Sequence, residues 1–176
     1  MKILKILLKV IIVIIVLFLV VALFLPSEYK VERSIEINQP VEVVYNYVAD
    51  FNNFYKWNPW TPFEPGHKVV VTGDSAAVGQ KYFWEGKTIG SGEMVFTELK
   101  PYSLIKADIE FLTPQHGTGK VDFVFVPNGN STKFSWSISG DADYLVGRYM
   151  GLMMDMIVGK NFDDGAKTLK EKCEAM

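Results

Sequence analysis

The chain has 176 residues, 49% of them hydrophobic and 14% aromatic, which is enough for one domain with its own core. The three lysines before residue 26 leave 15 basic against 20 acidic residues in the rest, a net charge of about −5 there. This balance gives the domain no electrostatic basis for binding nucleic acid. Its single cysteine, Cys173, excludes an internal disulfide, and no histidine or cysteine cluster has metal-ligand spacing. We therefore expect no metal and no cofactor.

An unbroken apolar run occupies residues 10–25, and Pro26 ends it. With residues 6–8, and with Lys9 extending toward the lipid head groups, it reaches the length of about 20 residues that spans a bilayer as a helix. A cleaved secretory signal peptide is the alternative, but its apolar core would exceed the usual length of about 7 to 15 residues, and no A-x-A-like site follows. The sequence therefore predicts a transmembrane anchor at residues 1–26, in contact with the membrane through residues 6–25, and a domain at residues 27–176.

The flanks of this run predict its orientation. Three lysines precede it, whereas residues 26–30 mix charges. The positive-inside rule then places the N-terminus in the cytoplasm and the domain on the extracytoplasmic side of a single-pass membrane protein.

From residue 30 the apolar residues alternate, and Val31, Ile35 and Ile37 share one face with Arg33, which predicts a strand. A proline suited to a first helical turn follows, and residues 41–51 have helical spacing. The stretch FNNFYKWNPW, residues 51–60, contains five aromatic residues and an Asn-Pro break. It predicts a second short helix that stops before Asn58.

Six further segments, bounded by glycine, proline, asparagine and aspartate, predict antiparallel strands at residues 67–73, 79–86, 90–101, 103–112, 119–129 and 132–140. Gly129 supplies the turn between the last two. Alternation in the last three strands predicts an inward face made of Ile105, Ala107, Ile109, Phe111, Val121, Phe123, Phe125, Phe134, Trp136 and Ile138.

After residue 140 the spacing becomes helical, and Phe162, Ala166, Leu169 and Cys173 form a stripe for packing on a sheet. The preceding segment, residues 144–159, is apolar on more than one face, and a break between the two is expected at Gly159 and Asn161. Its four methionines, at positions 150, 153, 154 and 156, suit either core filling or a mobile lid.

This order of elements resembles the helix-grip fold of the START/Bet v 1-like superfamily (SRPBCC), in particular its polyketide cyclase/dehydrase-like branch. The resemblance covers about residues 30–173 and rests on VERSIEINQPVEVVYNYVAD with the following WNPW, on GSGEMVFTELKP, on Thr132 and Trp136, and on MDMIVGKNFDDGAKTLKEK. It implies an α+β fold in which a curved antiparallel sheet of about seven strands wraps around a long C-terminal helix, supported by the two short helices. An apolar cavity between sheet and helix is also implied.

The side chains expected to line that cavity are Trp57, Trp60, Met94, Phe96, Ile109, Phe111, Phe123, Phe134, Trp136 and Met153. Core packing alone is the default interpretation of the aromatic rings, and the two interpretations can hold for different rings. The two arginines, Arg33 and Arg148, are candidates for holding a polar head group at the cavity mouth, although Asp155 is also placed to pair with Arg148.

No catalytic constellation is apparent. His67 and His116 fall in predicted loops, and neither has a nucleophile or acid at a suggestive spacing. The sequence therefore favours a membrane-tethered binding or transport module for a hydrophobic or amphipathic small molecule, such as a lipid. The alternatives are a polyketide cyclase/dehydrase-like enzyme acting on an apolar or aromatic substrate, and a protein-interaction domain whose cavity is filled.

Overall fold

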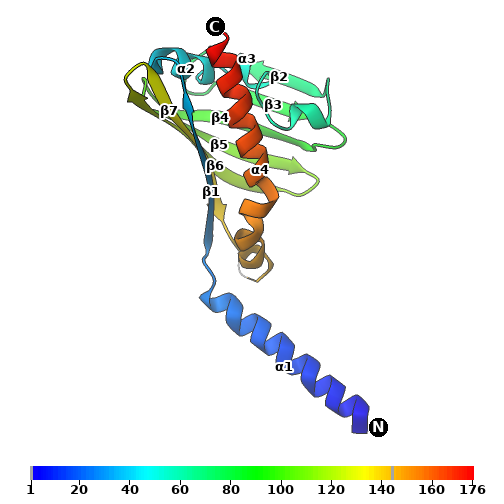
Figure 1. Cartoon of the computed structure of the whole chain (residues 1–176). Coiled ribbons are helices and arrows are strands. Elements are labelled where there is room, and N and C mark those ends of the chain that lie inside the picture. Colours follow the sequence, from blue (N-terminus) through cyan, green and yellow to red (C-terminus); the bar gives the residue numbers. More distant parts are fainter. Residues whose placement is uncertain (1, 144) are drawn as a thin grey trace.

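The computed structural model describes residues 2–143 and 145–176. A single helix stands apart from an α+β domain (Figure 1). The elements in chain order are α1 (Lys2–Phe24), β1 (Glu28–Ile37), α2 (Val41–Val48), α3 (Phe51–Phe54), a 3-10 turn η1 (Thr61–Phe63), β2 (Lys68–Thr72), β3 (Lys81–Glu85), β4 (Ser91–Lys100), β5 (Leu104–Thr113), β6 (Gly117–Asn128), β7 (Ser131–Asp141) and α4 (Val146–Glu174).

The seven strands form one antiparallel sheet in the order β1-β7-β6-β5-β4-β3-β2. The sheet curves around α4, and α2 and α3 lie at the end of the domain near the C-terminus (Figure 1). Because α2 and α3 follow β1 and precede β2, they carry the chain from one edge of the sheet to the other. The predicted helix-grip arrangement is confirmed, including the hairpin between β6 and β7 with Gly129 at φ 61°.

The predicted inward face forms the core. The predicted inward residues of β6 and β7 are all buried, as are Ile105 and Ala107 of β5. Toward the end of β5 the inward side chains become more exposed to solvent, since Ile109 is partly buried and Phe111 is 37% exposed. The side of the sheet facing α4 therefore has a closed part and a more open part.

The aromatic stretch after α2 closes one end of the core. Phe51 stacks on Phe96 with ring centroids 3.8 Å apart, and Phe54 meets Trp57 edge-on at 4.8 Å. The fully buried Gln80 accepts the Phe51 backbone N–H at 3.0 Å and donates to Asp50 at 3.0 Å. Because a buried unpaired N–H is costly, this amide fixes α3 against the sheet.

Helix α4 is continuous from Val146 to Glu174, so the predicted break at Gly159 and Asn161 is wrong. Tyr144, with which the predicted upstream segment began, lies outside the described residues. The glycine has another role, because a β-carbon at Gly159 would overlap the guanidinium of Arg33.

Arg33 uses this space to join β1 to α4. It pairs with Asp155 at 2.7 Å and with Asp163 at 3.0 Å, four residues to either side of Gly159. Asp155, considered from the sequence as a partner for Arg148, pairs with Arg33. The predicted stripe of Phe162, Ala166, Leu169 and Cys173 is buried as expected.

Helix α1 has 23 residues and is long and apolar enough to cross a membrane, a property it shares with signal sequences near the N-terminus. Its side chains are exposed almost throughout, with Ala22 as the buried exception. The domain contacts only the last two turns of α1 among the described residues, through Arg148 and Tyr149, and leaves most of its apolar surface exposed.

Candidate ligand-binding cavity

A cavity of about 190 Å³ lies between the sheet and α4. Every strand except β2 contributes to it, together with α3, the segment after α3, and the middle of α4. Its lining side chains are Tyr29, Phe54, Asn58, Trp60, Trp84, Ile89, Met94, Ile109, Phe111, Val121, Trp136, Ile138, Met154, Val158 and Phe162. The wall is mostly aromatic and aliphatic, which suits an apolar guest.

Five of the residues expected from the sequence line this cavity: Trp60, Met94, Ile109, Phe111 and Trp136. Four others, Trp57, Phe96, Phe123 and Phe134, are fully buried in the adjoining aromatic core and are not part of the wall. The structure therefore divides the predicted rings into packing and lining groups.

Met153 is also absent from the wall. Its side chain is 46% exposed, whereas its neighbour Met154 is half-buried and lines the cavity. Successive residues of a helix point about 100° apart, so a shift of one position moves a side chain from the cavity to the solvent side.

Trp84 lines the cavity although it was not predicted to, because the alternation of β3 was not assigned to a face of the sheet. In the sheet Trp84 lies opposite Gly92, and a β-carbon at Gly92 would overlap the Trp84 indole. The GSG stretch at residues 90–92 is thus a place where the backbone makes room for a ring, next to an irregularity in the β4–β5 register at Ser91 and Gly92. The sequence signal for this close approach was a glycine inside a strand pattern. Which ring lies against that glycine depends on the pairing register of β3 and β4.

Trp136 occupies a central place on the wall. Its ring meets Phe162 edge-on at 4.0 Å, and a β-carbon at Gly165 would come within 2.8 Å of it. The Trp136 side chain is 3% exposed, yet its indole N–H has no hydrogen-bond partner among the described residues. A buried unpaired donor is unusual and marks a position where an acceptor would be stabilising.

Apart from the tryptophan indoles, the polar side chains of the wall are those of Asn58 and Tyr29. The side-chain oxygen of Asn58 accepts the Trp60 backbone N–H at 2.9 Å. Burial, and then the nearby Asp141 carboxylate, raise the pKa of Tyr29, which therefore carries its proton at neutral pH. Tyr29 is the one titratable side chain among the described residues lining the cavity.

A family model described as polyketide cyclase/dehydrase and lipid transport matches residues 28–174. The chain belongs to this family. The family domain begins at Glu28, where β1 begins, and helix α1 lies outside it.

Solved structures share the fold of the polyketide cyclase/dehydrase family domain. The aromatase/cyclase Zhui from Streptomyces sp. R1128 is 15% identical with a TM-score of 0.58, over 84% of this chain and 94% of that one. The di-domain aromatase/cyclase StfQ of the steffimycin pathway is 12% identical with a TM-score of 0.62, over 85% of this chain and 51% of that one. Ara h 8.0201 is 9% identical with a TM-score of 0.56, over 85% of this chain and 99% of that one. No curated protein matches in sequence.

The remaining polar candidates lie away from the cavity of the family domain. His67 is buried, against the prediction of a solvated loop, and its Nδ1 lies 2.9 Å from the Glu64 carbonyl oxygen. His116 is exposed as predicted and pairs with Glu110 at 2.8 Å. Arg33 and Arg148 do not line the cavity, since Arg33 pairs with α4 and Arg148 donates to backbone carbonyls of α1.

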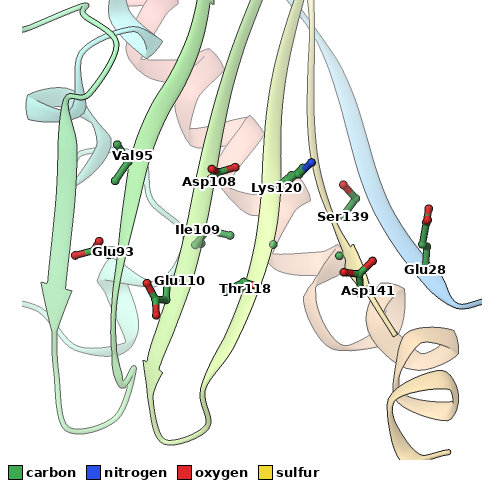
Figure 2. Close-up of a pocket in the computed structure, with 12 residues that line it drawn as sticks. Glu28, Glu93, Val95, Asp108, Ile109, Glu110, Thr118, Lys120, Ser139 and Asp141 are labelled. Atoms are coloured by element: carbon green, nitrogen blue, oxygen red, sulfur yellow. The ribbon is translucent and has the colours of Figure 1, made fainter. Parts of the chain in front are cut away.

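A second hollow, of about 550 Å³, lies on the opposite face of the sheet (Figure 2). Its polar side chains include five carboxylates and one amine: Glu28, Glu93, Asp108, Glu110, Asp141 and Lys120. Within residues 2–143 and 145–176, no group of three histidine, cysteine or acidic side chains is arranged to hold a metal. This acidic surface does not suit a hydrophobic guest.

Proposed function

We propose that the protein is a membrane-anchored module that binds a small apolar or amphipathic molecule between its sheet and α4. The observation that carries the proposal is the apolar cavity, whose lining residues include Trp136, and the buried indole N–H of Trp136 has no partner among the described residues. The length and apolarity of α1 support the anchor, and its lysine-rich start supports a cytoplasmic N-terminus and an extracytoplasmic domain.

The size of the cavity limits the guest. About 190 Å³ is less than the roughly 300 to 1,000 Å³ of typical small-molecule sites. A single ring system, or one short segment of a lipid or isoprenoid chain, fits this space. The remainder of a larger amphipathic molecule would extend past the partly exposed Phe111 or between α4 and the sheet.

The unpaired donor limits the guest further. A buried N–H without an acceptor costs about 1 to 3 kcal/mol, and a carbonyl or hydroxyl oxygen on the guest would recover part of that cost. We therefore expect the ligand to be apolar with at least one acceptor oxygen.

A matched pair of probes tests both features. Ethylbenzene and acetophenone have similar shapes, but only acetophenone has an acceptor. Both should raise the melting temperature of the full chain in a neutral detergent, because a guest that binds only the folded state stabilises it. Acetophenone should give the larger shift, and its advantage should vanish in Trp136→Phe, which retains a ring and removes the donor.

Filling the cavity supplies the control. Val158→Trp should abolish the effect of both probes, whereas the exposed His116→Ala should leave both unchanged. If neither probe, nor any molecule that co-purifies with the protein by mass spectrometry, stabilises the parent chain, the cavity is packing space and the protein-interaction alternative replaces this proposal.

A cyclase-like enzyme is the second candidate, favoured by the position of the Tyr29 phenol on the cavity wall, where it is the one titratable side chain among the described residues. In that role the neutral phenol of Tyr29 would donate a hydrogen bond to an oxygen atom of an apolar or aromatic substrate and orient it. Tyr29→Phe would then abolish turnover while leaving the probe-induced stabilisation intact. Unchanged turnover in this variant would remove the candidate.

A further inference from the structure

The first three turns of α4 expose a band of large apolar side chains. We call it the apolar band, and its members are 45% to 80% exposed: Val146, Met150, Leu152, Met153, Met156 and Ile157. At about 100° per residue they lie next to one another on the side of α4 that faces away from the cavity. Exposed apolar residues gathered in one place mark a contact surface.

Helix α1 touches the same turns of α4. The Tyr149 hydroxyl donates to the Phe18 carbonyl at 2.9 Å, and the two rings stack with centroids 4.1 Å apart. Arg148 donates to the carbonyls of Ala22 at 2.8 Å and Leu23 at 3.1 Å. The beginning of α4 therefore lies beside the last two turns of α1.

These contacts fix the depth of the apolar band relative to the predicted membrane span. Phe18 lies seven residues before Leu25, the end of the apolar run, which is about 10 Å along a helix. The carbonyls that end a helix have no partner within it, and in a bilayer no water replaces one. Arg148 supplies the donor for two of them, so this junction is suited to the membrane interface.

We propose that the apolar band rests in the lipid bilayer interface beside α1, an inference that depends on the proposed membrane anchor. The bilayer is the occupant because the band continues the apolar surface of α1, and because residues 149–154 carry no charge. Interfacial helices bury one apolar face about 5 to 10 Å into the head-group boundary, which agrees with the level of Phe18.

The position of the cavity indicates how this membrane contact would serve ligand binding. Met154 and Val158 line the cavity from the same turns of α4 that carry the apolar band. With the band in the interface, an apolar guest passes between the bilayer and the cavity along α4 without crossing water.

Depth-dependent quenching in the full chain tests the proposal. The parent chain has one thiol, that of Cys173, and burial raises its pKa to about 12, so a thiol-reactive fluorophore labels introduced cysteines selectively. Met153→Cys and Met156→Cys report on the apolar band. Val126→Cys on β6 is the control matched to Met153, since these apolar residues are 49% and 46% exposed. Val16→Cys reports on α1.

Each variant is reconstituted into phosphatidylcholine vesicles with and without nitroxide-labelled lipid. We expect strong quenching at positions 16, 153 and 156 and none at position 126. Circular dichroism melts that match the parent verify that each labelled chain is folded.

The possible failures are distinguishable. Quenching at position 16 with none at 153 and 156 would overturn the interfacial contact and leave the anchor standing. No quenching at position 16 would overturn the anchor, and the contact with it. Labels at 153 that are shielded from both water and lipid, in chains that cross-link as pairs, would assign the apolar band to a second copy instead of the bilayer.

Discussion

The two halves of α4 both carry apolar side chains at helical spacing, but these side chains have different surroundings. In the C-terminal half, Phe162, Leu169 and Cys173 are buried against the sheet, while Lys160 and Asp164 form an ion pair on the outer side. In the N-terminal half, Met154 and Val158 face the cavity, and the apolar band covers the side where charges would be expected. An apolar residue inside the domain is explained by the core, but one outside it requires another surface.

The largest effect expected from this comparison concerns membrane association. If α1 spans the bilayer, the full chain stays in the membrane fraction after a high-salt wash, because helix insertion, unlike surface charge binding, is insensitive to screening. Fractionation followed by N-terminal sequencing measures this. A mature chain that starts near Ser27 would instead support the signal-peptide interpretation and leave the apolar band without its neighbour.

Replacing one large apolar side chain with alanine should affect stability differently in the two halves of α4. Leu169 is fully buried, so Leu169→Ala should lower the free energy of unfolding by about 2 to 5 kcal/mol. Met156 is 80% exposed, so Met156→Ala should change it by no more than about 0.5 kcal/mol. Denaturant titration in detergent measures both. Equal losses would mean that the apolar band packs against protein.

Gly159 joins the two halves, and its variant tests the role of Arg33. Replacing a helical glycine with alanine ordinarily stabilises by about 1 kcal/mol. Here the new β-carbon would displace the Arg33 guanidinium, so Gly159→Ala should raise the free energy of unfolding of the parent chain very little. Denaturant titration in detergent measures this change. In an Arg33→Met background the full gain of about 1 kcal/mol should return. The same gain in both backgrounds would show that Arg33 adapts freely.

The smallest expected effect is a pH dependence of the link between β1 and α4. The hydrogen bond and ion pair with Arg33 lower the pKa of Asp155. A lowered carboxyl pKa gives stability that is present above the unfolded-state value of about 3.9 and is lost as the pH falls through the folded-state value. Melting temperatures measured from pH 7 down to about pH 2 should therefore fall less steeply for Asp155→Asn than for the parent, with the difference appearing below about pH 4. Parallel curves would contradict this.

Much of the fold was predictable from the sequence because it depends on local periodicity. Strand alternation identified the inward residues of β5 to β7, and helical spacing identified the buried stripe of α4 from Phe162 to Cys173. Side chains repeat every two residues in a strand and every 3.6 in a helix regardless of what they pack on. The order of the elements then predicted the family, which the match over residues 28–174 confirms.

The cavity wall depended on tertiary structure. Trp57 and Trp60 have equal apolar character, yet only Trp60 reaches the cavity, and Met154 lies there in place of Met153. Trp84 became a wall residue through its register with Gly92 on the neighbouring strand. These outcomes depend on the curvature of the sheet and on the rotation of α4 about its axis, which no local spacing encodes.

For the polar groups, too, the sequence predicted part of the outcome and the tertiary structure decided the rest. From the sequence alone, hydropathy marked α1 as apolar, and the neighbouring proline and glycine residues marked the two histidines as loop residues. Only the folded chain placed His67 in a buried position, gave Arg33 two carboxylates on α4, and set Arg148 on the carbonyls of α1. A charged side chain is stabilised by partners from distant parts of the chain, so its role is decided when the sheet, α4 and the end of α1 come together.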